Sequence, residues 1–284
     1  MITKVPLHAV PGVAVALLAC ALSCALSTAA TAEDASPWQQ GSHAAVRLLA
    51  GSRSGAVLLG GVAFQLEPGW KTYWRTPGDS GVPPRFDFSK SDNIDAVTVL
   101  WPAPSKFPDG AGGHSLGYKN HVVLPLRIVA TNADKPITLR ATVNFAVCDK
   151  LCIPAEASME LAFASVASAE DSALAAALDT VPKPARIGDP NPLTIRDVKR
   201  EGQSTVTVDV ASASPKDDVS LFVEGPTPDW ALPIPTQLNH APRGVKRFSF
   251  KLDGLPANTS PEGAALKLTL VGGKQAYEFN TNLQ

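Results

Sequence analysis

The sequence predicts an all-β protein of two β-sandwich domains joined by a short helical linker. Three observations lead to this prediction: segments of alternating apolar and polar residues recur, Pro (25) and Gly (21) are plentiful, and one segment alone has a helical pattern. Alternation with period two is typical of strands with one buried face, and Pro and Gly mark turns. The 284 residues, 45% apolar and 18% charged, are enough for two globular domains.

The first segment, residues 1–32, predicts a secretory signal peptide. Lys4 provides a positive start, residues 9–26 are an apolar run, and a small-x-small site ends at Ala32. We expect cleavage after Ala32 and export to an oxidising compartment. Two alternatives stay open: an uncleaved membrane anchor, and a lipoprotein attached through Cys20.

The first domain is predicted over residues 37–165. Residues 56–66 are apolar and predict a strand pair or one bent strand, with a bulge at Gly60-Gly61. Residues 121–129 predict a further apolar strand. This pattern of short strands and turns favours a sandwich.

Two alternating segments flank the cysteines that remain after signal cleavage. Residues 140–147 place four apolar residues on one face, and residues 158–163 alternate in the same way. We expect these strands to pair, with Cys148 and Cys152 in the connection between them. Cys148 then leaves its strand on the polar side.

The linker is predicted over residues 166–187. Residues 169–178 have helix-favouring composition, with Ser168 as the expected cap and acidic residues in the first turn. Pro182 and Pro184 end the helix.

The second domain, residues 188–284, is predicted as a smaller sandwich. Its alternating positions are Val206, Val208 and Val210; Val219, Leu221 and Val223; Phe248, Phe250 and Leu252; Leu266, Leu268 and Leu270; and Tyr277 and Phe279. It contains no cysteine, and its residues form no recognisable catalytic constellation.

The pair Cys148 and Cys152 is the one reactive-looking constellation. Two nearby cysteines in an oxidising compartment are expected to form a disulfide, and the three-residue spacing requires the chain to bend there. Closing so short a loop removes little entropy from the unfolded chain, which favours a redox role over a structural one. A structural disulfide and one copper(I) ion held by two thiolates stay open as alternatives. We expect no cofactor and no zinc site.

An aromatic cluster precedes a Gly/Pro-rich loop at residues 77–84. It is either packed core or an apolar wall that shields the disulfide from nonspecific exchange. The shielding or partner-binding candidates are Trp70, Tyr73, Trp74, Phe107 and Tyr118.

Other chemistries lack support in the sequence. The formal net charge of −1 provides no basic footprint for nucleic acid and no polybasic membrane patch. No Gly-rich phosphate loop precedes a helix, and no Ser-His-Asp set is suggested.

Taken together, several motifs resemble the periplasmic N-terminal region of DsbD-type thiol:disulfide interchange proteins, and within that family the ScsB-like branch. In chain order they are Gly69-Trp70-Lys71-Thr72-Tyr73-Trp74-Arg75-Thr76-Pro77-Gly78-Asp79-Ser80-Gly81, Trp101-Pro102-Ala103-Pro104, Gly117-Tyr118 and Val147-Cys148 through Cys152-Ile153-Pro154. The resemblance covers residues 40–165 and extends into the second sandwich. It implies two immunoglobulin-like β-sandwich domains joined by a short helical linker.

The resemblance also implies a function. Cys148 and Cys152 are the expected redox pair of a periplasmic protein-disulfide reductase, which relays electrons to disulfide-bonded protein substrates in copper tolerance or cytochrome c maturation. Because the chain ends at Gln284 with no transmembrane bundle, we expect a membrane-embedded thiol electron donor acting in trans. The alternative is a non-catalytic two-sandwich adaptor with a structural disulfide.

Overall fold

The structure is a computed structural model that describes residues 1, 3, 33–214 and 217–284. The predicted signal peptide, apart from Met1 and Thr3, lies outside the described residues. The described residues from 33 onward belong to one compact unit.

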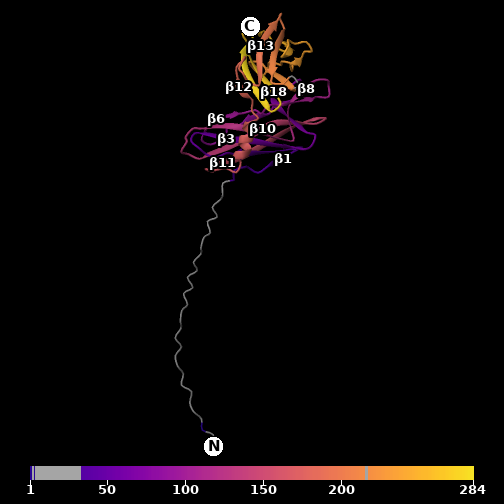
Figure 1. Ribbon diagram of the computed structural model, residues 1–284. Coiled ribbons are helices and arrows are strands. Elements are labelled where there is room, and N and C mark those ends of the chain that lie inside the picture. The colour runs from indigo at the N-terminus through magenta and orange to yellow at the C-terminus, as the bar shows by residue number, and fades with distance from the viewer. Residues whose placement is uncertain (2, 4–32, 215–216) are drawn as a thin grey trace. The chain divides into compact units, whose positions relative to one another are not determined.

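The first sandwich packs two antiparallel sheets face to face (Figure 1). One sheet has the order β1–β2–β3–β9–β6, with β1 (Gln39–Gly41), β2 (Ala44–Ala50), β3 (Val57–Leu66), β9 (His121–Ala130) and β6 (Ile94–Val99). The other has the order β11–β10–β4–β8–β7, with β11 (Cys152–Phe163), β10 (Ile137–Cys148), β4 (Lys71–Gly78), β8 (His114–Lys119) and β7 (Ser105–Pro108). The short strand β5 (Arg85–Asp87) also pairs with β10.

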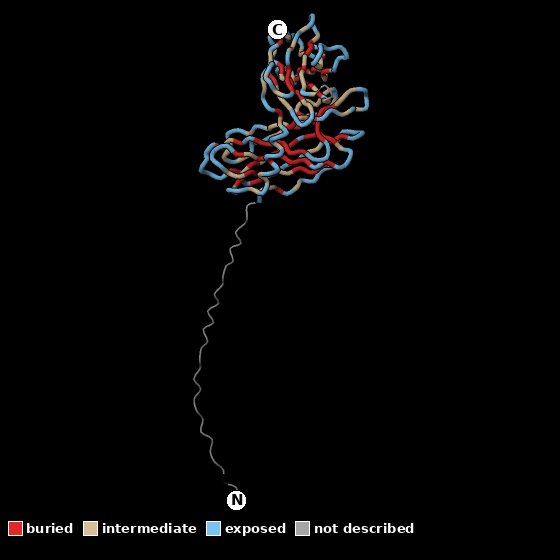
Figure 2. The backbone as a smooth tube through the Cα atoms, in the orientation of Figure 1, coloured by how far each residue is buried: buried red, intermediate tan, exposed pale blue. Residues whose placement is uncertain are grey.

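The alternation in the sequence builds the core between these sheets. Figure 2 shows the buried residues running along the strands. The inward residues of β10 are those that the alternation predicts: Ala141, Val143, Phe145 and Val147. Strands β10 and β11 pair along their whole length, which confirms the predicted pairing.

The predicted bulge at Gly60-Gly61 is wrong, because β3 pairs in continuous register with both of its neighbours. Close packing explains the two glycines instead. A Cβ at Gly60 would meet the Phe163 ring, and one at Gly61 would meet the Leu174 side chain.

Helix α1 (Asp171–Leu178) begins two residues later than predicted, and Glu170 occupies its N-cap position without a side-chain cap hydrogen bond. Ser168 lies two residues before that position; its hydroxyl accepts from the Glu170 amide at 3.0 Å and donates to the Ala50 carbonyl. The helix buries Leu174 on the outer face of the β2–β3–β9 sheet, so it covers the first sandwich.

The second sandwich also has two sheets. One has the order β12–β19–β18–β15, with β12 (Lys183–Ala185), β19 (Gln275–Asn282), β18 (Ala265–Gly272) and β15 (Val219–Glu224). The other has the order β13–β14–β17–β16, with β13 (Leu193–Glu201), β14 (Thr205–Ser212), β17 (Lys246–Lys251) and β16 (Thr236–Gln237). The apolar residues that alternate in the sequence form a second core, separate from the first.

In the described part of the chain, no helix has the length and apolar character needed to cross a bilayer.

Candidate functional site

The two cysteines close the β10–β11 hairpin. Cys148 is the last residue of β10 and Cys152 the first of β11, and the two are directly paired in the ladder. A disulfide joins them, with 4.2 Å between their Cα atoms. The turn between them is held by the Asp149 amide, which donates to the Leu151 carbonyl. The expected disulfide is therefore present in the structure, at a hairpin mouth.

The two sulfur-bearing residues differ in exposure. Cys148 is 2% exposed, whereas Cys152 lies at the surface. Leu151, beside Cys152 in the turn, is 77% exposed. A thiol from another molecule can therefore approach Cys152 but meets protein at Cys148.

Tyr73 covers Cys148 on the outer face of the β4–β10 sheet. Its hydroxyl donates a hydrogen bond to the Cys148 Sγ at 2.7 Å and lies 3.2 Å from the Cys152 Sγ. Burial raises the pKa of Tyr73, so the phenol keeps its proton at neutral pH. With Ala146 and Cys148 it forms a small buried cluster.

The Gly/Pro-rich loop covers Tyr73 in turn. Gly81 has a φ of 129°, which favours glycine, and a Cβ at this position would clash with the Tyr73 ring. The loop is fastened at two neighbouring residues: Asp79 accepts from the His114 amide at 2.9 Å, and Ser80 donates to Asp109 at 3.2 Å. Tyr73 is therefore held between the disulfide and a fixed loop.

Lys71 is a site residue that the sequence analysis did not select. It pairs with Cys148 across one edge of β4 and with Lys119 across the other. Its side chain is largely buried, and Nζ donates to the Pro108 carbonyl at 3.5 Å. Burial, followed by the charge of Lys119, lowers the pKa of Lys71. The period-two pattern, which places Lys71 on the face of Tyr73, is the signal that could have identified it.

Trp70 and Phe107 lie near the edges of this region. Trp70 stacks on the His43 ring with 3.8 Å between centroids, and His43 is hydrogen-bonded to Glu67. Phe107 has the Lys119 ammonium over its ring. Neither aromatic residue hydrogen-bonds to the sulfurs in the described structure.

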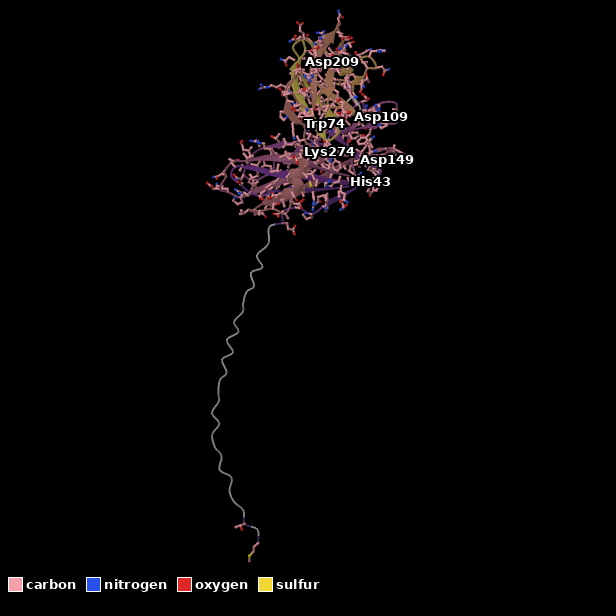
Figure 3. The ribbon with its side chains drawn as sticks, viewed as in Figure 1. His43, Trp74, Asp109, Asp149, Asp209 and Lys274 are labelled. Atoms are coloured by element: carbon pink, nitrogen blue, oxygen red, sulfur yellow. A yellow bond between two sulfur atoms is a disulfide. The ribbon has the colours of Figure 1, made fainter. Side chains whose placement is uncertain are left out.

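Trp74 and Tyr118 lie in the main core (Figure 3 labels Trp74). Since Trp74 follows Tyr73 directly in the strand, its side chain points to the opposite face of the sheet. The Tyr118 hydroxyl donates to the Pro102 carbonyl at 2.8 Å. Of the five aromatic candidates, Tyr73 is therefore the one that the structure brings to the disulfide.

The described residues also bear on metal binding. They contain no group of three or more His, Cys, Asp or Glu side chains arranged to hold a metal ion.

Comparison with known proteins gives one family and one informative solved structure. Residues 44–164 match the family described as "Thiol:disulfide interchange protein DsbD, N-terminal". The N-terminal periplasmic domain of ScsB from Proteus mirabilis superposes with a TM-score of 0.70 at 23% identity, over 88% of this chain and 98% of that chain. That likeness shows the shared fold, and confirms the predicted all-β architecture.

A conserved domain protein from Bacillus anthracis aligns with a TM-score of 0.24 at 10% identity, over 84% of this chain and 76% of that chain. The search of curated proteins finds no match.

Proposed function

We propose, from the match of residues 44–164 to the DsbD N-terminal family, that this protein exchanges thiols and disulfides through Cys148 and Cys152. The observation that carries the proposal is the asymmetry of the disulfide. Cys152, an exposed residue, is disulfide-bonded to the buried Cys148, whose sulfur accepts a hydrogen bond from Tyr73. That arrangement suits a bond that is opened from one side.

The exchange begins at Cys152. A partner thiolate attacks the Cys152 Sγ along the S–S bond, a new disulfide forms between partner and Cys152, and the electron pair of the broken bond stays on the Cys148 Sγ as a thiolate. The Tyr73 hydroxyl already points at that sulfur and stabilises the charge, because a hydrogen bond to an ionised acceptor is stronger than one to a neutral acceptor.

The second half of the reaction releases the partner. The partner's other thiolate attacks its own sulfur in the mixed disulfide, and Cys152 leaves as a thiolate. The partner dithiol has become a disulfide, and this protein holds the dithiol. The reverse steps on a substrate disulfide transfer the two electrons onward.

The family also informs the setting that we propose. The matched ScsB domain is periplasmic, and the sequence of residues 1–32 supports export with cleavage after Ala32. A membrane-embedded thiol protein is then the electron donor, and periplasmic proteins with disulfides are the substrates. Copper tolerance and cytochrome c maturation are the processes in which we place the relay.

We also propose a division into domains. Residues 37–165 carry the redox pair, residues 166–187 connect, and residues 188–284 form the second domain. The two separate hydrophobic cores support this division.

A trapping experiment tests the function. In cells, affinity-tagged Cys148→Ser leaves Cys152 free and should accumulate mixed disulfides with donor and substrate, about tenfold more than Cys152→Ser, because the reachable sulfur forms the complex. Nonreducing gels and mass spectrometry of the purified complexes measure this.

The other outcomes of the trapping experiment are equally informative. Complexes that collect mainly on Cys152→Ser would reverse the assignment of the attacked sulfur. Complexes on neither variant would overturn the relay and favour an adaptor with a structural disulfide.

A further inference from the structure

Strand β4 runs from the disulfide to the second sandwich. Near its start, Tyr73 hydrogen-bonds to the sulfurs. Two residues later, the Arg75 side chain hydrogen-bonds to Glu224 of the second sandwich. Strand β4 therefore carries both Tyr73, which covers Cys148, and Arg75, which contacts the second sandwich.

The second sandwich holds Arg75 with carboxylates from two strands. Two nitrogens of Arg75 donate to Glu224 in β15. Nε donates to Oε1 at 2.9 Å, and Nη2 donates to Oε2 at 2.7 Å. Nη2 also donates to Glu278 in β19 at 2.6 Å. The Thr76 hydroxyl adds a bond to Glu224 at 2.9 Å. A bidentate contact of this kind fixes the plane of the guanidinium.

The surroundings of Arg75 make this contact stronger than a surface ion pair. The side chains of Arg75, Glu224 and Glu278 are 21%, 15% and 22% exposed. Burial by itself would lower the pKa of Arg75, but the hydrogen bonds and the negative charges of the two glutamates together outweigh it, so the pKa is raised. The guanidinium also stacks over the Trp74 ring, which packs on Phe222 of β15.

The second sandwich also supports the loop that covers Tyr73. A Cβ at Gly78, the last residue of β4, would lie 3.1 Å from the Ile234 side chain. Ile234 belongs to the β15–β16 connection and packs against the first core. The second sandwich thus contacts both the strand that carries Tyr73 and the loop that covers Tyr73.

We propose that Arg75 is a positioning residue, through which the second sandwich keeps Tyr73 and the Gly81 loop closed over Cys148. The inference rests on the proposed function only in taking Cys148 as the inner member of the reacting pair. When the Arg75 contacts with Glu224 and Glu278 are removed, β4 and its loop loosen. The buried Cys148 sulfur then becomes reachable, while the already exposed Cys152 changes much less.

The test measures alkylation of single cysteines by iodoacetamide in the full chain. In Cys152→Ser, Cys148 is the thiol that is followed, and adding Arg75→Met should raise its alkylation rate about tenfold, since thiol reactivity follows exposure. The rate is taken as its limit at high pH, where Cys148 is fully ionised, so that a change in its pKa does not enter. In Cys148→Ser, Arg75→Met should change the rate at Cys152 much less, because Cys152 is already exposed.

Three further variants separate positioning from general loosening. Arg140→Met removes another arginine held by two carboxylates, Glu160 and Asp92, and should leave the Cys148 rate unchanged. In a Tyr73→Ala background Cys148 is already uncovered, so Arg75→Met should add nothing to its rate. Arg75→Lys, which keeps one charge, should restore part of the protection.

Either of two results would overturn the inference: an unchanged Cys148 rate in folded Arg75→Met, or an equal increase in the Tyr73→Ala background. If circular dichroism shows that Arg75→Met is unfolded, the double variant Glu224→Gln, Glu278→Gln makes the same test from the other side. Iodoacetamide needs no partner protein, so failure of this inference and failure to trap complexes are distinguishable.

Discussion

The two sandwiches have one architecture and treat the outer faces of their sheets differently. In the second, Asp209 of β14 faces Arg247 of β17 across the ladder, and the two side chains satisfy each other at 2.6 Å. In the first, Cys148 of β10 faces Lys71 of β4; both are buried, and Tyr73 with its covering loop lies over Cys148. The covered outer face, and not the sandwich architecture itself, therefore distinguishes the domain that carries the cysteine pair.

The largest change in unfolding free energy is expected from a substitution in the core of the second sandwich. Leu268 is fully buried there. Leu268→Ala should cost about 2–5 kcal/mol of unfolding free energy, through lost burial and a residual cavity. Urea unfolding followed by circular dichroism measures the loss, and a loss under about 1 kcal/mol would show that the site collapses around the smaller side chain.

A smaller effect is expected when the second sandwich is removed. A chain that ends at Thr180 should fold and keep a reducible disulfide, because the first sandwich retains nearly all of its core. It should be less stable by about 1–3 kcal/mol, since Phe222 no longer covers Trp74. Urea unfolding and a thiol count by mass spectrometry before and after reductant measure the two outcomes. A chain that is unfolded, or that contains free thiols before reduction, would contradict independent folding.

The cross-strand pair of the second sandwich should show a pH-dependent effect. The Arg247 hydrogen bond lowers the pKa of Asp209 in the folded protein. A lowered folded pKa means stabilisation that is complete above the unfolded value of about 3.9 and is lost as the pH falls through the folded pKa. Asp209→Asn should therefore cost up to about 1 kcal/mol at pH 7 and nothing near pH 2. Unfolding curves at the two pH values decide, and an equal cost at both would exclude the charge as its origin.

The smallest effect is expected at the exposed pair of the first sandwich. The Arg140 contacts with Glu160 and Asp92 lie on the surface. Arg140→Met should leave the unfolding free energy nearly unchanged, because exposed ion pairs contribute little to stability. A larger loss by urea unfolding would mean that these contacts also fix the β10–β11 pairing, and the contrast with buried Arg75 would weaken.

Local patterns predicted much of this structure. The alternation on either side of the cysteines was enough to pair β10 with β11, and the one helical segment lies within two residues of its predicted start. The glycine pair in β3 misled, because a strand glycine marks either a bulge or a close approach, and its neighbours in space decide which.

The site was predicted less completely than the fold. The sequence identified the cysteines and an aromatic cluster, but it could not assign Tyr73 to the disulfide and Trp74 to the core. That assignment depends on which face of β4 lies outward, and the register between β4 and β10 sets the face. The bond of Arg75 to Glu224 joins residues 149 positions apart, and no local pattern reports such a contact.

The free edge of strand β11 matters for a chain that folds before its disulfide forms. It is the outermost strand of its sheet, so its free backbone edge is a template for pairing with a second copy. Pro154 offers no amide hydrogen there, and Glu156 places an exposed negative charge on the same strand. Two copies brought edge to edge would lack a ladder hydrogen bond at the proline and would repel each other, which protects the newly made hairpin from aggregation while its thiols are still free.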